Sequence, residues 1–432
     1  MVARIVAICF VFGLASIAWM VLGGVTTQRT WSQGERLGPE VQSLWGRSHA
    51  QHAPVPSFHW EETRESTRTE YKDGQSVNIT EQNQVKLEKP VRFSATDLAV
   101  DLGLDQRLKG LMWYSLYNVG FQGRWSYVHR EPQAGRLRVA FDFPVAEGLY
   151  DGFRFVVDGE DRAARLQPEN GRVFTEVEVK PGQTLSVEIG YHSRGIDEWR
   201  YVPAQGVVSL ENFRLLMNTD FDAIDFPADT ISPSLKTPTD AGHQLTWAFK
   251  QVVTGQGMGM KMPSRLQPGQ LASALSFSAP VSLLFYFLIL FVLGTIRRID
   301  IHPVNYLFIA GAFFAFHLLF AYSVDHLRIV PAFLVSSVVS MVLVVTYLRL
   351  VVGARFAFVE AALAQLLYMV GFSLAHFWEG FTGLTVTVLS IVTLFVLMQL
   401  TGRVRWSEVF ARPTRASGTN DGPATLGASG TA

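Results

Sequence analysis

The feature that most constrains the fold is the placement of six apolar stretches, one at the N-terminus and five crowded into the last third of the chain. Each is close to the ~20 residues that a helix needs to cross a bilayer. Backbone N–H and C=O groups find no water in hydrocarbon, so each stretch must pair its own groups as a helix. The sequence therefore predicts a polytopic membrane protein, with helices near residues 5–24, 271–296, 303–322, 330–350, 355–376 and 381–401.

Arginine placement predicts how the chain crosses the membrane, because cationic side chains in short connections stay on the cytoplasmic side. One set of connections and ends carries Arg4, Arg297, Arg298, Arg349, Arg355, Arg403 and Arg405. The opposite connections carry only Arg328. We therefore expect both termini in the cytoplasm of a bacterial cell, a multi-pass inner-membrane location, and residues 25–270 in the periplasm.

The N-terminal stretch has a second interpretation, since an arginine followed by an apolar run also begins a cleaved signal peptide. The run here exceeds the ~7 to 15 residues of a signal core, and no small-x-small cleavage pattern follows Gly24. A retained anchor over residues 1–24 is the preferred interpretation.

The polar segment shows the alternation of apolar and polar residues that is typical of β-strands. Its clearest instance runs from Val173 to Tyr191 around a Pro181-Gly182 turn, which predicts a hairpin with one buried face. We expect an α+β membrane protein whose residues 25–232 form an antiparallel β-sandwich, as one unit or as two divided near Ala134. Proline and glycine predict a loop-rich linker at 233–270, before a five-helix domain at 271–402 and a disordered cytoplasmic tail at 403–432.

Composition argues against several functional classes. The formal net charge is zero, so no basic field indicates nucleic-acid binding. The single cysteine, Cys9, lies in the first apolar stretch, and His49, His52 and His59 are better explained by a solvated loop than by a metal site. No phosphate-binding loop, zinc motif or complete nucleophile elbow is found, so we expect no enzyme activity, cofactor or metal.

Polar residues within the helices are the first functional candidates, because an ionised side chain at mid-bilayer costs about 2.5 to 3.5 kcal/mol on insertion scales. They could line a polar path or relay protons. The alternative is structural: an acidic side chain near a helix end reaches the interface, and a histidine pairs with a neighbouring helix. The candidates are Glu360, His317, His376, Asp325 and His326.

The outer segment carries one conspicuous polar motif, residues 191–201, with the candidates Arg194, Trp199 and Arg200. Aromatic, guanidinium and carboxylate groups together suit recognition of a glycan or peptide. The alternative places Trp199 in the β core and the charges at its rim.

The stretch Ile301-His302-Pro303-Val304-Asn305-Tyr306 resembles the Ile-His-Pro-Val-x-Tyr signature of the CreD family of inner-membrane proteins. Phe316-His317-Leu318-Leu319 with Asp325-His326, and the ending Arg403-Val404-Arg405-Trp406, are also similar to that family. The likeness is good from Pro280 to Trp406 and faint over 25–270, and the turn at 377–381 departs from the family pattern. Independently of the resemblance, Pro303 suits the first turn of a helix with His302 just outside it.

The resemblance implies a cell-envelope integrity protein with no accepted catalytic mechanism. We therefore expect a bundle that anchors a periplasmic β domain, with the bilayer and an envelope protein or glycan as partners. The rival expectation is a transporter or channel that moves a small solute past Glu360 and His317. Neither ligand nor oligomeric state follows from the sequence.

Overall fold

The computed structural model describes residues 2–72, 75–110, 112–204, 206–378 and 380–402. The chain divides into two compact units. Residues 1–26 and 271–432 form a helical unit, and residues 27–270 form a sheet-rich unit. The chain is thus α+β, and the expected tail at 403–432 lies outside the described residues.

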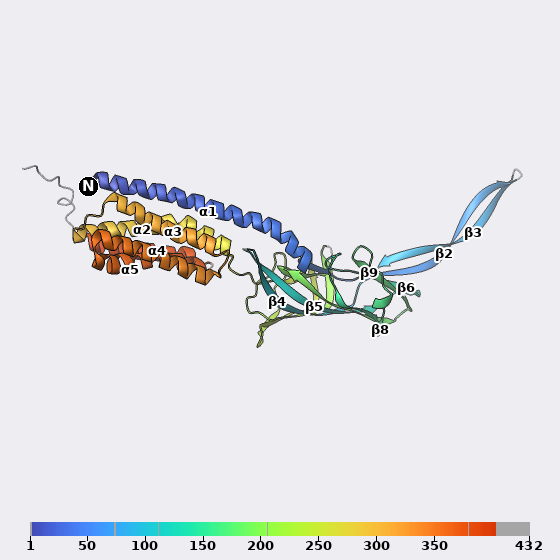
Figure 1. The fold of residues 1–432 in the computed structure, drawn as a ribbon. Coiled ribbons are helices and arrows are strands. Elements are labelled where there is room, and N and C mark those ends of the chain that lie inside the picture. Colours follow the sequence, from blue (N-terminus) through green and yellow to red (C-terminus); the bar gives the residue numbers. More distant parts are fainter. Residues whose placement is uncertain (1, 73–74, 111, 205, 379, 403–432) are drawn as a thin grey trace, which may run out of the picture. The chain divides into compact units, whose positions relative to one another are not determined.

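Within the described residues, six helices are long and apolar enough to cross a membrane, in agreement with the sequence. Figure 1 shows the helices of the C-terminal region lying side by side. Their bounds are α1 Val2–Trp45, α2 Pro268–Arg297, α3 Pro303–Ser323, α4 Ile329–Val352, a composite fifth span Phe356–Phe377 and α7 Thr382–Thr401.

The fifth span is irregular. Two π-helical segments, η2 (Phe356–Ala361) and η3 (Leu366–Gly371), alternate with the short helices α5 (Ala362–Gln365) and α6 (Phe372–Leu374), and a 3₁₀ turn, η4 (Ala375–Phe377), ends it. Such widened turns disturb the regular hydrogen-bond ladder, and neighbouring hydroxyls often satisfy the freed carbonyls in membranes. Here α2 supplies them: Ser282 donates to the Tyr368 carbonyl, and the Tyr286 hydroxyl donates to the Ala361 carbonyl at 3.4 Å.

The first helix is longer than predicted, because α1 continues past Gly24 to Trp45. Its residues 27–45 belong to the sheet-rich unit. Leu37 and Val41, one helical turn apart, are buried there, whereas the polar residues around them are mostly exposed. The first strand therefore begins later than the predicted domain boundary at Val25, because the narrow apolar face of this helical extension gives little periodic signal in the sequence.

Three sheets make up the other unit. Their orders are β13-β14-β12-β4-β5-β10-β7-β8, β3-β2-β6-β9 and β1-β11-β15. Most pairings are antiparallel, but β4 pairs with β12 and β1 with β11 in parallel. The bounds are β1 His49–His52, β2 Val55–Lys72, β3 Gln75–Pro90, β4 Ala95–Lys109, β5 Met112–Val128, β6 Gly135–Asp142, β7 Asp151–Val157, β8 Glu160–Asp161, β9 Arg172–Val179, β10 Thr184–Ile196, β11 Glu198–Val202, β12 Val208–Thr219, β13 Leu235–Pro238, β14 His243–Thr254 and β15 Met258–Lys261.

The hairpin predicted between Val173 and Tyr191 is wrong in its pairing. Both strands exist, as β9 and β10, but β9 pairs with β6 whereas β10 pairs with β5 and β7. The Pro181-Gly182 turn carries the chain from one sheet to another. A period of two residues identifies the buried face of a strand and says nothing about its neighbour.

Residues 233–270 are also more ordered than the predicted linker, since they contain β13, β14 and β15. Met258, Met260 and Met262 are buried in the core of the unit. The prolines and glycines that suggested a loop lie mostly at the ends of these strands. The histidines 49, 52 and 59 likewise lie on β1 and β2, and not in the loop that we expected.

One hydrophobic core draws residues from all three sheets, including Phe121 and Leu215 of the eight-stranded sheet, Phe141 of the four-stranded sheet and Trp199 of the three-stranded sheet. Residues 27–270 therefore form one unit, and the division near Ala134 does not occur. Beyond His59, β2 pairs with no described strand except β3, and these two strands project from their sheet as a ribbon (Figure 1).

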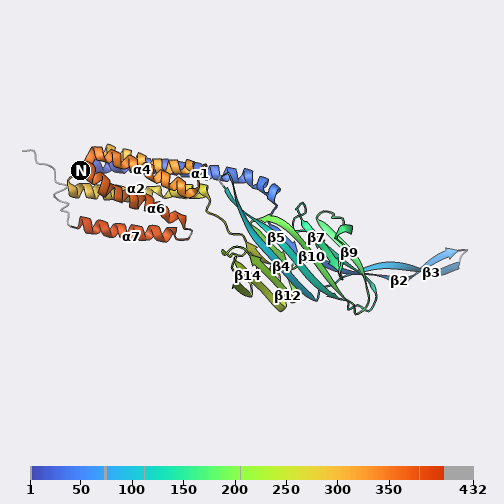
Figure 2. The ribbon, with the colours of Figure 1, turned by 60° about the horizontal axis from the view of Figure 1, so that its bottom comes forward.

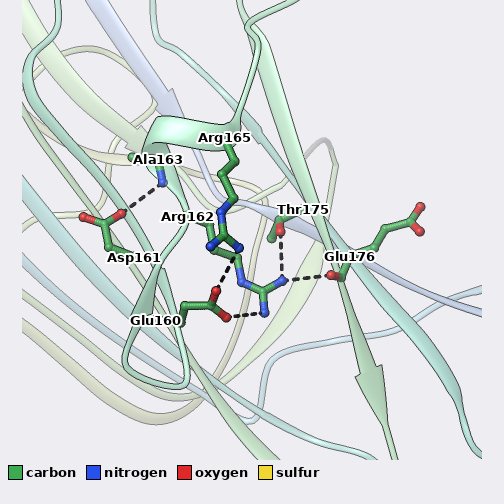
Figure 3. A network of polar contacts seen from close by, with 7 residues as sticks. All are labelled: Glu160, Asp161, Arg162, Ala163, Arg165, Thr175 and Glu176. Carbon is green, nitrogen blue, oxygen red and sulfur yellow. Dashed lines mark hydrogen bonds and ion pairs between the residues drawn. The ribbon is translucent and has the colours of Figure 1, made fainter.

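A polar clamp joins two of the sheets (Figure 3). Arg162, just after β8, donates through Nη1 to the Glu176 carbonyl of β9 at 2.9 Å and through Nη2 to Glu160 at 2.9 Å. Arg165 donates to the other Glu160 oxygen at 3.0 Å. The Asp161 carboxylate accepts from the Ala163 N–H at 3.0 Å and fixes the short 3₁₀ turn η1 (Ala163–Arg165).

We predict that Arg162→Ala loosens β9, because it removes charge-assisted hydrogen bonds worth about 1.5–3 kcal/mol each. Backbone amides of Arg172–Val179 should exchange with deuterium at least ~10-fold faster, since a tenfold change corresponds to only ~1.4 kcal/mol. Arg165→Ala is the control, since this side chain is 77% exposed and such pairs contribute little. Equal exchange rates in both variants would show that Arg162 does not join the sheets.

Candidate functional site

The strongest candidate site is a polar groove on the outward face of the eight-stranded sheet. It crosses four adjacent strands, β12, β4, β5 and β10, which Figure 2 shows lying side by side. Their registers align outward-facing residues in rows across the strands. The central row reads Asn218, Asp101, Gly120, His192 and, on β7, Asp151.

We call this groove, which follows the central row from Asn218 to His192, the polar groove. Glycines form its floor. Gly103, Gly120 and Gly190 stand at outward positions, and an added Cβ at Gly120 would lie 3.4 Å from the His192 ring. On a strand, such glycines mark a place where a ligand or another backbone approaches closely. Two hollows of about 320 and 710 Å³ meet at His192 along this floor.

Side chains along the larger hollow are held by one another. The Gln244 amide donates to Asn218 at 3.1 Å, and the Asn218 amide donates to Asp101 at 2.8 Å. At its far end, an Asp220 oxygen accepts from the Leu104 N–H at 2.8 Å. Because these side chains are held by hydrogen bonds within the sheet-rich unit, they are preorganised to exchange hydrogen bonds with a ligand.

The charge balance differs between the two hollows. The smaller one holds the ion pair of Arg124 and Glu188, at 2.9 Å. The larger one is lined by Asp101, Asp151 and Asp220, and among the described residues none of these carboxylates forms an ion pair. Its single arginine, Arg194, stacks over the Trp45 ring with 5.5 Å between Cζ and the ring centroid. The larger hollow is therefore acidic.

The three candidates from the 191–201 motif separate in the structure. Arg194 lines the polar groove. Trp199 is fully buried and packs against Phe121, with ring centroids 6.2 Å apart. Arg200 is partly exposed and lies 3.8 Å from Glu198. Within this motif the chain leaves β10 of the eight-stranded sheet and enters β11 of the three-stranded sheet. The motif therefore does not form one recognition surface.

The candidates of the helical region also lie apart. Glu360 is mostly buried and pairs with Arg297 at 2.9 Å. His317 is buried, its Nδ1 lies 3.0 Å from the Phe313 carbonyl, and its ring meets Trp19 edge-on. His376 stands in the 3₁₀ turn η4, against Phe372. No hydrogen bond, ion pair or ring contact among the described residues joins Glu360 to either histidine, so no continuous relay is seen.

The remaining candidates mark helix ends. Asp325 and His326 are exposed in the turn between α3 and α4. His302 is the N-cap of α3, its Nδ1 accepts from the Val304 N–H at 3.3 Å, and Pro303 is the first helical residue, as the sequence predicted. Tyr306 is buried against Phe287. Arg403 to Trp406 lie outside the described residues.

Sequence reasoning missed the residues that line the polar groove. Asp97 and Asp101 alternate with buried Leu98 and Val100 on β4, and the signal was available as the polar half of that alternation. What the sequence lacks is the register that sets Asp101 beside Asn218, more than 100 residues away. Gln365, a polar residue of the fifth apolar stretch, was not among the predicted site residues, although it is completely buried between the two π segments.

Comparison with known proteins agrees with the family resemblance. Residues 277–407 match the family model described as inner membrane protein CreD. No curated protein matches this chain. A crystal structure from Legionella pneumophila, described as a proposed nutrient binding protein, shares 10% identity and a TM-score of 0.32, and covers 56% of this chain and 76% of its own. Likeness at that level carries no argument about fold or ligand.

Proposed function

We propose that this chain, whose residues 277–407 match the CreD inner-membrane family, holds a binding domain on the periplasmic side of the membrane and supports envelope integrity without catalysis. The observation that carries the proposal is the polar groove across β12, β4, β5 and β10. Its ligand would be an envelope component. Apolar helices and the family match fit a membrane protein, and the helical unit would serve as its anchor.

Arginine contacts within the helical unit support the proposed orientation. Arg4 pairs with Asp300 between α2 and α3, and Arg297 at the end of α2 pairs with Glu360 near the start of the fifth span. These charges therefore gather at one end of the bundle, where the positive-inside rule places the cytoplasm. The opposite connection carries Arg328. The proposal accordingly has both termini in the cytoplasm.

The proposed sandwich rests on the shared core. Phe121 of the eight-stranded sheet and Phe141 of the four-stranded sheet both pack against Tyr191 of β10, with centroids 5.2 and 6.5 Å from its ring. Two sheets with facing apolar sides bury them against each other. This arrangement leaves the outward side of the larger sheet free to carry the polar groove.

A side chain placed on the groove floor should abolish function in cells. We predict that Gly120→Gln, at a position with ordinary backbone geometry, removes protection against detergent in cells that depend on this protein. Ser186→Gln, on the same face of β10 but outside both hollows, should protect fully. Membrane abundance of each variant is measured alongside.

A second candidate, transport of a small solute, is favoured by one observation. The Gln365 Oε1 is buried between two π segments and has no hydrogen-bond donor in the described part of the chain, and widened turns frequently occur at functional sites. If Gly120→Gln protects cells and Gln365→Leu, at normal abundance, does not, the helical unit performs the function and the binding proposal is wrong.

A further inference from the structure

We infer that the polar groove binds an uncharged, hydroxyl-rich saccharide chain, an inference that rests on the proposed function of the groove. The hydrogen-bonding groups of the groove, its charge and the position of its strands within the sheet all favour this class of ligand.

The hydrogen-bonding groups match hydroxyls. Asp101 and Asp220 offer carboxylate oxygens that only accept, whereas Asn118 and Asn218 offer amides that both donate and accept. A sugar hydroxyl donates one hydrogen bond and accepts others, so neighbouring carboxylate and amide groups satisfy it completely. The hydrogen bonds from Gln244 to Asn218 and from Asn218 to Asp101 engage the Asn218 Oδ1 and the Asp101 Oδ1. The second carboxylate oxygen of Asp101 is then left to accept from a ligand.

The charge argues against an anionic ligand. A phosphate or carboxylate group is recognised by arginine or lysine clusters. The larger hollow instead presents three carboxylates without ion-pair partners in the described part of the chain against a single arginine, Arg194, so its net charge is negative. An anion placed there would meet like charges, whereas a neutral hydroxyl would not.

The position of the strands argues against an extended peptide. Peptides that bind sheets by their backbone add to a free edge. Along the central row of the groove, Asn218, Asp101, Gly120 and His192 each have a paired neighbour on both sides, so this row offers no free edge to an extended peptide. The groove also spans three strand spacings, about 14 Å, over glycines that leave room for rings lying flat on the sheet.

Calorimetry on the full chain in lipid nanodiscs tests the inference, because glucoside and maltoside detergents carry competing hydroxyls. The probes are uncharged hexamers of glucose and of N-acetylglucosamine, with inorganic polyphosphate and an unstructured decapeptide as alternatives. We expect at least one hexamer to bind, and Asp101→Ala and Asn218→Ala to weaken it at least tenfold each. Asp222→Ala, 90% exposed and outside the groove, should not weaken it.

Several outcomes would overturn the inference. Saccharide affinity unchanged in Asp101→Ala and Asn218→Ala would place the sugar elsewhere, provided both variants show wild-type thermal unfolding. Binding of polyphosphate or peptide, with no saccharide binding, would assign another class of ligand. If no saccharide binds while Gly120→Gln still removes protection in cells, the saccharide is wrong and the binding function stands. If Gly120→Gln protects cells, the proposed function itself fails.

Discussion

Trp199→Ala should destabilise the sheet-rich unit by about 3–5 kcal/mol, the usual cost of truncating a buried aromatic side chain. Trp199 is completely buried on β11, between His49 of β1 and Met260 of β15 in register. Its removal leaves a cavity against Phe121, whose ring centroid lies 6.2 Å from that of Trp199. The measurement is the urea concentration at which residues 27–270 lose protease resistance in the full chain.

Arg200→Ala is the matched control, because this neighbour is 42% exposed and its pair with Glu198 is long. We expect it to change stability by less than ~0.5 kcal/mol. The comparison decides between the two interpretations of the 191–201 motif. If Trp199→Ala unfolds like the wild type but loses ligand, Trp199 is a recognition residue and the core assignment is wrong.

Acidification from pH 6.5 to 4 should remove about 3 kcal/mol of stability through a single buried histidine. Burial lowers the pKa of His49 from 6.5 to about 4, and its Nδ1 has no hydrogen-bond partner among the residues that the structure describes. Below pH 6.5, His49 becomes protonated in the unfolded chain but stays neutral in the folded chain. The free energy of unfolding therefore falls with pH until the folded-state pKa is reached. Each pKa unit corresponds to ~1.4 kcal/mol.

Other groups titrate over the same range, so the test compares variants. The urea midpoint of the sheet-rich unit is measured at several pH values for the wild type, His49→Gln and His52→Gln. The His49→Gln curve should be flatter by about 3 kcal/mol, because glutamine does not titrate. The His52→Gln curve should follow the wild type. Parallel curves for all three proteins would contradict the burial of a neutral His49.

The membrane-spanning helices were the most predictable part of the fold. Their signal lies in local composition, since each span must satisfy its own backbone in hydrocarbon. The start of α3 at Pro303 followed for the same reason, because proline and the His302 cap act within one turn. The π segments of the fifth span were not predictable, since they depend on hydroxyls from α2, more than 70 residues away.

In the sheets, the position of individual strands was predictable from the sequence, but their pairing was not. The alternation in β9 and β10 correctly identified two strands and their buried faces, but pairing depends on contacts distant in sequence. Tyr191 shows the difference: the residue was expected in a local hairpin, yet its hydroxyl donates to Gln51, 140 residues away, at 2.7 Å. The polar groove was missed for the same reason, since Asp101 and Asn218 meet only after β4 and β12 pair.

Thiol labelling tests the central claim, a polar groove open to the periplasm, most directly. In a Cys9→Ser background, which removes the only cysteine, single cysteines replace Asp101 in the groove and Arg298 after α2. Cells with a permeabilised outer membrane are treated with a maleimide that cannot cross the inner membrane. We expect the thiol at position 101 to react in intact spheroplasts and the thiol at 298 only after lysis. A shielded thiol at 101, or an exposed one at 298, would contradict the account.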